Sequence, residues 1–125
     1  MLVKDFMIKD VYVMNETESL KSLLELFVEK KIGGVPVVDE NNRLKGIISD
    51  GDVLRTLKPK TYTSYYAFYI EELDETIVAN ANKPLKKVMH KKVVTLDEND
   101  DLEAALKLLA NHHFKKIPVV NQNKE

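Results

Sequence analysis

The four residues VPVV at positions 35–38 return 82 positions later as IPVV at positions 117–120. Working outward from these stretches, residues 3–43 align with residues 85–125 without a gap, and twelve of the 41 aligned pairs are identical. Many of the matches fall at apolar positions, as expected of two copies that build the same kind of core. Identical apolar pairs include Met7/Met89, Leu20/Leu102, Leu24/Leu106 and Val38/Val120. The chain therefore contains an internal repeat.

Each copy is expected to begin with a short strand followed by a helix. Residues 11–14 (VYVM) and 93–96 (VVTL) are rich in β-branched side chains, which favour strands. Thr17 and Asn99 are the expected N-caps of the helices that follow. Apolar residues then recur at i, i+3, i+4 and i+7, the spacing of one helical face that packs on a sheet. They are Leu20, Leu23, Leu24 and Phe27 in the first copy and Leu102, Ala105, Leu106 and Leu109 in the second.

The VPVV and IPVV stretches predict a second strand in each copy. Because proline has no amide hydrogen, Pro36 and Pro118 are expected at strand starts or edges. The first copy continues through a polar turn into a third strand at 44–48 and a short helix that begins near Asp50. The second copy reaches Glu125 at the point where its third strand would begin.

The fold class that follows is α+β, with two tandem β-α-β-β-α repeats and the second repeat truncated at its C-terminus. The first repeat is expected at 1–57, a partly helical connector at 58–84 and the incomplete second repeat at 85–125. The connector holds five of the nine aromatic residues, at positions 62, 65, 66, 68 and 69. They are expected to cover the sheet or a dimer interface, and a lid or a partner-docking surface is the alternative.

Composition excludes several classes of protein. The 19 basic and 20 acidic residues give a net charge of −1, which provides no general field for attracting nucleic acid or an anionic membrane. The chain has no cysteine, so disulfides and zinc–thiolate sites are excluded, and a cytoplasmic location is expected. No stretch has the roughly 20 apolar residues needed to span a bilayer.

Two further motifs carry a family resemblance. Residues 35–39 (VPVVD) and 46–53 (GIISDGDV) resemble the motifs of CBS domains, and their tandem arrangement resembles a CBS pair, or Bateman module. The segments 5–7 (DFM) and 87–89 (KVM) resemble the lead into the first strand. The resemblance implies that the two repeats are related by pseudo-twofold symmetry and pack through their sheets. It also implies two clefts between them that hold an adenosine ligand such as AMP, ADP, ATP or S-adenosylmethionine. It also implies a homodimer that regulates an attached or partner protein.

The residues that follow the third strand suit a ribose and a phosphate. Ser49 and Asp50 are expected at a helix N-terminus, where free N–H groups and the helix dipole favour an anion. Asp52, in the first turn, can accept hydrogen bonds from both vicinal ribose hydroxyls. Gly46 and Gly51 allow close approach of a backbone. On the residues alone, Ser49 and Asp50 are better explained as helix caps and Asp52 as a solvated acid, and it is the repeat with the family resemblance that favours ligand binding.

The resemblance places the remaining ligand contacts. It implies that the adenine lies near the start of the first strand and just before the second, and that basic residues of the opposite repeat meet the phosphates. The adenine positions are Val11, Tyr12, Ile32, Gly33 and Gly34, and the basic positions are Lys115 and Lys116. The two clefts are unequal because the first copy has glycines where the second has lysines. The Ser/Asp arm of the second cleft would lie beyond residue 125.

No group of residues suggests catalysis, so we expect a regulatory binding module that is not an enzyme and requires no cofactor. His90, His112 and His113 could be interpreted as metal ligands, but surface or interface positions near a helix end are expected instead. A dimerisation scaffold without a ligand is the first alternative function, and a sensor of divalent cations is the second. The regulated protein and the nucleotide are not identified by the sequence.

Overall fold

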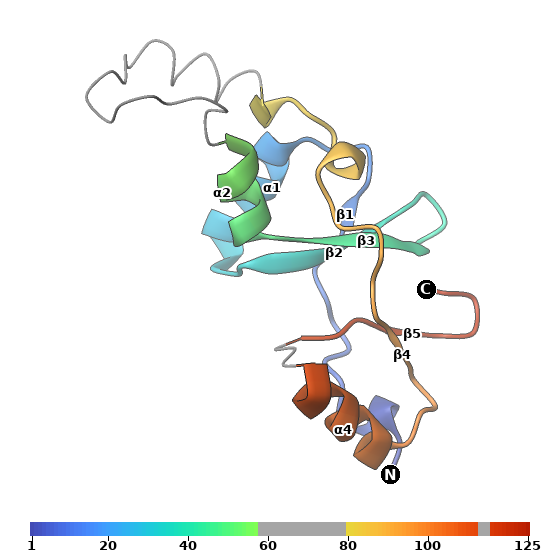
Figure 1. Ribbon diagram of the computed structural model, residues 1–125. Coiled ribbons are helices and arrows are strands. Elements are labelled where there is room, and N and C mark those ends of the chain that lie inside the picture. Colours follow the sequence, from blue (N-terminus) through green and yellow to red (C-terminus); the bar gives the residue numbers. More distant parts are fainter. Residues whose placement is uncertain (58–79, 113–115) are drawn as a thin grey trace.

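The computed structural model describes residues 1–57, 80–112 and 116–125 (Figure 1). The connector residues 58–79, with their aromatic side chains, lie outside the described residues, as do His113 and Lys115. The elements, in chain order, are the 3₁₀ turn η1 (Val3–Asp5), β1 (Met14–Asn15), α1 (Leu20–Lys30), β2 (Gly34–Val38), β3 (Leu44–Ser49), α2 (Asp50–Leu57), the 3₁₀ turn η2 (Leu85–Lys87), β4 (Leu96–Asp97), α4 (Leu102–His112) and β5 (Val119–Val120).

The internal repeat is confirmed by strand register. In the first repeat β1 pairs with β2 in parallel, Met14 opposite Val37, and in the second β4 pairs with β5 in parallel, Leu96 opposite Val119. Both members of the second pair lie 82 positions after those of the first, so the two copies form the same ladder. The first sheet has the order β1-β2-β3, with β2 and β3 antiparallel, while β4 and β5 form a two-stranded sheet. The α+β class and the repeated β-α-β unit are as predicted.

The two repeats exchange their leading segments. The amide of Val3 donates to the carbonyl of Asp100 at 2.9 Å, and the amide of Leu85, its equivalent, donates to the carbonyl of Glu18 at 2.8 Å. The next residues repeat this exchange, with Lys4 donating to Glu98 and Lys86 donating to Glu16. In Figure 1 the N-terminal segment accordingly lies beside α4, while the segment that leads from the connector lies over the first sheet. The pseudo-twofold relation is therefore expressed as a reciprocal swap.

Each hydrophobic core contains one buried residue supplied by the other repeat, with Val88 and Met89 packed beside the first and Met7 beside the second. Leu85 is fully buried in the first core, and Val3 is buried in the second beside Leu96 and Ala105. Burial of an apolar side chain of this size contributes about 1.5–3 kcal/mol. The other buried members of the first core are Met14, Leu20, Leu23, Phe27, Val35, Val37, Ile48 and Val53.

The first strands are shorter than predicted, because they begin at Met14 and Leu96 rather than at residues 11 and 93. Proline explains the difference. Pro36 lies inside the central strand β2, so its predicted place at a strand start or edge was wrong. Pro36 lies opposite Ile47 on β3, and the amide and carbonyl of Ile47 both bond to His90 rather than to β2. In an antiparallel pair of this kind, the backbone nitrogen and carbonyl of Pro36 face the other neighbour, β1. Since Pro36 has no N–H to donate there, the ladder with β1 cannot extend to earlier residues.

The helix caps also differ from the prediction. Ser19, not Thr17, caps α1 and accepts from the amide of Ser22 at 3.2 Å. The side chain of Asp101, not Asn99, accepts from the amide of Ala104 at the start of α4. The predicted caps, Thr17 and Asn99, instead belong to the backbone turn that precedes each helix. In these turns the amide of Thr17 donates to the side chain of Asn15, and the amide of Asn99 donates to the side chain of Asp97. Equivalent residues thus cap both helices, two positions later than expected.

The predicted apolar stripe is correct for α1 and partly wrong for α4. Leu20, Leu23 and Phe27 are buried, and Leu24 packs against them. On α4, Ala105 is buried and Leu108 packs on the core, but Leu106 is 55% exposed.

Candidate ligand site at the start of the second helix

The Ser49–Asp52 pair forms a reciprocal cap where β3 passes into α2. The amide and the hydroxyl of Ser49 donate to Oδ2 of Asp52 at 2.9 and 3.0 Å, and the amide of Asp52 lies 3.4 Å from Oγ of Ser49. This is the capping-box arrangement, in which residues three apart satisfy each other's free amides. Ser49 is therefore a cap, as one interpretation of the sequence held. Asp52 is not the solvated acid of that interpretation, because it is only 6% exposed.

The other carboxylate oxygen of Asp52 is held by two hydrogen-bonding side chains. Arg55, one turn along α2, donates to Oδ1, and Nε2 of His90 lies 2.7 Å from the same oxygen. Arg55 and His90 remain largely in solvent, with 70% and 61% of their side chains exposed. A buried carboxylate is thus joined to two exposed donors, one from each repeat.

These contacts determine the protonation of Asp52. Burial alone would raise the pKa of the carboxyl group, but hydrogen bonds from the amide of Ser49, from His90, from Arg55 and from the hydroxyl of Ser49 outweigh it. The pKa of Asp52 therefore lies below its ordinary value. The carboxylate is ionised at neutral pH and can act only as a hydrogen-bond acceptor.

Gly33 and Gly34, at the start of β2, lie against this cap. Gly34 pairs with Ser49 across the β2–β3 ladder, and the amide of Asp50 donates to the carbonyl of Gly33 at 2.8 Å. A side chain at Gly33 would place its Cβ 3.0 Å from the carboxylate of Asp50, so the contact requires glycine or a shift of Asp50. Ile32, just before them, is half-buried against the first core. The fold therefore brings Ile32, Gly33, Gly34, Ser49, Asp50 and Asp52 to one edge of the first sheet.

The other residues of the predicted site have no described contact with this cap. Val11 and Tyr12 are about half exposed, and the ring of Tyr12 faces the ammonium group of Lys30 at 5.5 Å. Lys116 is exposed, and within the described residues its side chain has no ion pair. Lys115 lies outside them, so the basic side of the cleft is represented by Lys116 alone.

His90 is the residue that sequence reasoning missed. It was expected near a helix end, yet its backbone pairs with Ile47 through two hydrogen bonds of 3.0 and 2.9 Å and so adds a short edge to β3. Gly46 makes this approach possible, because a Cβ there would lie 2.6 Å from the carbonyl oxygen of His90 and 2.7 Å from Sδ of Met89. The close approach predicted for Gly46 is therefore made by the second repeat. The presence of glycine at position 46 was the one signal in the sequence that another backbone segment could pass close to β3 here.

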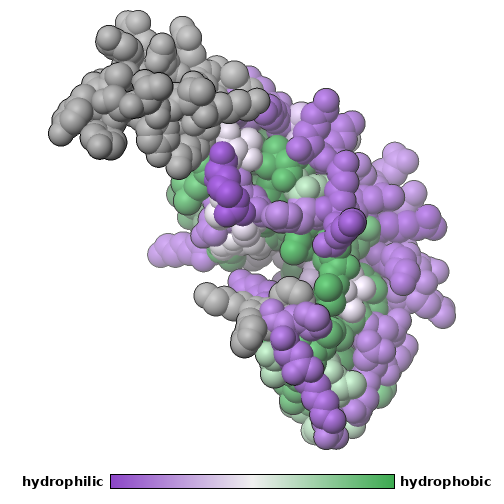
Figure 2. Space-filling view, viewed as in Figure 1, coloured by the Kyte–Doolittle hydropathy of each residue, from purple (hydrophilic) through white to green (hydrophobic). Residues whose placement is uncertain are grey.

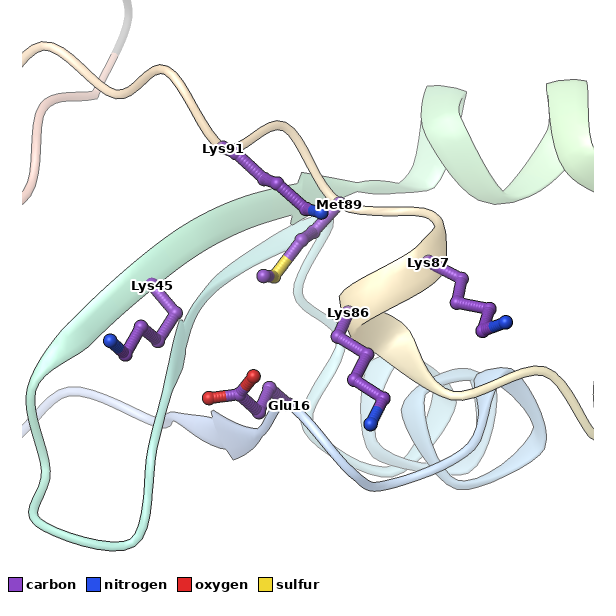
Figure 3. Close-up of a pocket in the computed structure, with 6 residues that line it drawn as sticks. All are labelled: Glu16, Lys45, Lys86, Lys87, Met89 and Lys91. Carbon is purple, nitrogen blue, oxygen red and sulfur yellow. The ribbon is translucent and has the colours of Figure 1, made fainter.

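A hollow on the surface is lined by residues on either side of the crossing segment. It has a volume of about 560 Å³ and contains none of the predicted site residues (Figure 3). Its lining residues are Glu16, Lys45, Lys86, Lys87, Met89 and Lys91. Figure 3 shows the amines of Lys45, Lys86 and Lys87 pointing in different directions rather than toward one point. This geometry does not form a defined anion site.

No cluster of three or more potential metal ligands occurs within residues 1–57, 80–112 and 116–125. In the same part of the chain, no helix is long and apolar enough to cross a membrane.

The fold and the cap together define a tandem repeat module whose two halves share their cores. The family model of the CBS domain matches residues 3–59 and 85–125. The chain belongs to the CBS-domain family, as the motifs predicted, and forms a CBS pair.

Relatives of known sequence and structure agree with this assignment. The chain is 31% identical to the chloroplastic CBS domain-containing protein CBSX2 of Arabidopsis thaliana over 95% of this chain, and it spans 55% of that protein. It is 29% identical to the uncharacterized protein MJ1426 of Methanocaldococcus jannaschii, over 97% of this chain and 80% of that one. A crystal structure of CBSX2 in complex with AMP superposes with a TM-score of 0.76 at 30% identity, covering 99% of this chain and 84% of that one.

Proposed function

We propose that this chain is a regulatory module that binds the adenosine part of a nucleotide at the Ser49–Asp52 cap and controls an attached or partner protein. The observation that carries the proposal is the ionised, buried carboxylate of Asp52 at the start of α2, beside the backbone of Gly33 and Gly34. The complex of CBSX2 with AMP supports the choice of ligand class.

The chemistry of the cap fits such a ligand. A carboxylate that is ionised at neutral pH can accept hydrogen bonds from the two vicinal hydroxyls of a ribose. The first turn of α2 begins there, and the positive end of its helix dipole favours a phosphate, although the amides of Asp50, Gly51 and Asp52 already have acceptors. Gly33 and Gly34 carry no side chains, which leaves their backbone accessible to a flat base. Val11, Tyr12 and Lys116 complete the proposed site, together with Lys115.

The main alternative is a scaffold that dimerises without a ligand. Exposed apolar residues such as Val28 on α1 and Leu54 on α2, at 78% and 69%, support association with a second copy. Figure 2 shows apolar patches between the hydrophilic side chains of the face in view. Dimerisation and ligand binding are compatible, so the proposal includes a homodimer. A cytoplasmic location and independence of any cofactor remain predictions.

Calorimetric titration of the full chain with AMP, ADP, ATP, S-adenosylmethionine and adenosine tests the proposal. A charge-assisted hydrogen bond contributes roughly 1.5–3 kcal/mol, so Asp52→Ala should weaken binding on the order of 10- to 100-fold. Lys116→Ala should weaken ADP and ATP more than adenosine, and its effect should shrink at high salt because it is electrostatic.

Asp10→Ala is a matched control, because Asp10 is an exposed acid in the same repeat. It should bind like the original chain. Circular dichroism must show that Asp52→Ala remains folded. If the unaltered chain binds no adenosine compound at millimolar concentration, the scaffold function replaces the sensor.

A further inference from the structure

We propose that His90 lowers the affinity of the ligand site, because its imidazole contacts Oδ1 of Asp52 and the ribose diol must displace it from there. Ligand binding would then break a side-chain contact between the two repeats. This inference rests on the proposed function and identifies His90 as the residue that competes with the ligand.

The argument begins with the acceptor capacity of Asp52. A carboxylate offers about four lone-pair positions. The amide and hydroxyl of Ser49 fill those of Oδ2, while Arg55 and His90 fill those of Oδ1. A ribose diol brings two further donors, so it can bind only where existing donors leave.

Burial decides which donors leave. The bonds from Ser49 belong to the cap of α2 and are partly buried, so losing them would leave amides unsatisfied. Arg55 and His90 are mostly exposed, and water can replace their lost hydrogen bonds at little cost. The diol is therefore expected at Oδ1.

His90 differs from Arg55 in its place in the chain. Arg55 lies on α2 itself, whereas His90 belongs to the segment that crosses from the second repeat. The backbone of His90 stays paired with Ile47 through two hydrogen bonds, so the imidazole can rotate away without undocking the segment. Displacement thus changes one side-chain contact at the junction of the repeats.

The charges around the imidazole give this contact a pH dependence. The groups on α2 that face it are Asp52, which is negative, and Arg55, which is positive. Its partner on β3, Ile47, is uncharged, and Lys91 and Lys92 follow it in its own segment. Histidine commonly changes charge between about pH 5 and 8, and the imidazolium is the stronger donor to a carboxylate. Competition with the diol should therefore be strongest in acid.

Calorimetry with adenosine, which has the diol but no phosphate, tests the inference on the full chain at pH 5.5 and 8.0. His90→Ala should bind adenosine roughly 2- to 10-fold more tightly than the original chain at pH 8.0, and by a larger factor at pH 5.5. In His90→Gln the side chain can still donate a hydrogen bond to Asp52 but cannot become charged. The affinity of this variant for adenosine should therefore change between pH 5.5 and 8.0 by no more than the affinity of His90→Ala does. Lys92→Ala, an exposed neighbour, is the control and should behave like the original chain.

A second measurement follows the imidazole directly. In the nitrogen-15 spectrum of the original chain, saturating adenosine should move the His90 resonance toward its position in Asp52→Ala without adenosine, where the acceptor of the imidazole is gone. An unmoved resonance, or His90→Ala binding adenosine no more tightly than the original chain, overturns the inference while Asp52-dependent binding leaves the proposed function intact. If the original chain binds no adenosine compound, both fail together.

Discussion

Leu85 belongs to the second repeat in chain order, yet it is fully buried in the first, where its amide donates to the carbonyl of Glu18 at 2.8 Å. Val3 and Asp100 form the equivalent contact in the opposite direction. The stability of each half therefore depends on a segment that lies far from it in the sequence.

Leu85→Ala tests this dependence. Replacing a buried leucine with alanine removes apolar contacts and leaves a cavity, which costs about 2–5 kcal/mol of unfolding free energy. Urea denaturation followed by circular dichroism measures the loss. Ile8→Ala is the control, since Ile8 is 81% exposed and its replacement should cost less than about 0.5 kcal/mol. Equal losses in the two variants would contradict the exchange of segments.

Gly46→Ala is expected to disturb the crossing of the second repeat over β3. The added methyl group would lie 2.6 Å from the carbonyl oxygen of His90, so the backbone of one strand must move. We expect a fall in melting temperature and faster hydrogen exchange at the amides of Ile47 and His90. Gly51→Ala is the matched control, because its nearest neighbour is the flexible end of Arg55 at 3.4 Å. The prediction fails if the two variants melt alike.

Asp52 should make the stability of the chain depend on pH in acid. The pKa of this carboxyl group is lower in the folded chain than its unfolded value of about 3.9. The ionised carboxylate therefore contributes to the unfolding free energy above that pH. The contribution is lost as the pH falls through the folded pKa. The difference in unfolding free energy between the original chain and Asp52→Asn should therefore narrow below about pH 4. Asp10→Asn, at an exposed position, should show no such narrowing.

The caps give a prediction that separates the observed from the expected positions. Asp101→Ala removes the acceptor for the amide of Ala104 and should cost about 0.5–2 kcal/mol. Asn99→Ala leaves that bond in place and should cost only a few tenths of a kcal/mol. Thermal unfolding of the two variants decides between them. A larger loss for Asn99→Ala would restore the cap that the sequence pattern favoured.

Much of each repeat could be predicted because it depends on local pattern. The spacing of Leu20, Leu23 and Phe27 indicated α1, and the apolar runs around Val37 and Ile48 indicated adjacent strands. The first strands were predicted to begin too early, because β-branched residues alone indicate a strand. The prediction did not include the missing N–H group of Pro36 on the side that faces β1.

The candidate site was predictable in part for the same reason. Ser49 and Asp52 are three residues apart, so their mutual cap is a local property of the sequence. The contact of His90 with Asp52 joins residues 38 positions apart, and no periodicity records it. The exchange of Val3 and Leu85 was equally invisible, since an apolar residue carries no mark of which core it enters.

The reciprocal swap also bears on how the chain acquires its structure during synthesis. The ribosome synthesises the first repeat before Leu85, so the core of that repeat stays incomplete until the segment with Leu85 has emerged. The N-terminal segment waits longer, because its partner Asp100 is synthesised after Leu85. Contacts of such large sequence separation are slow to form, and the chain exposes apolar surface meanwhile. Nascent chains of this protein are therefore expected to be natural clients of chaperones, although each finished repeat is small.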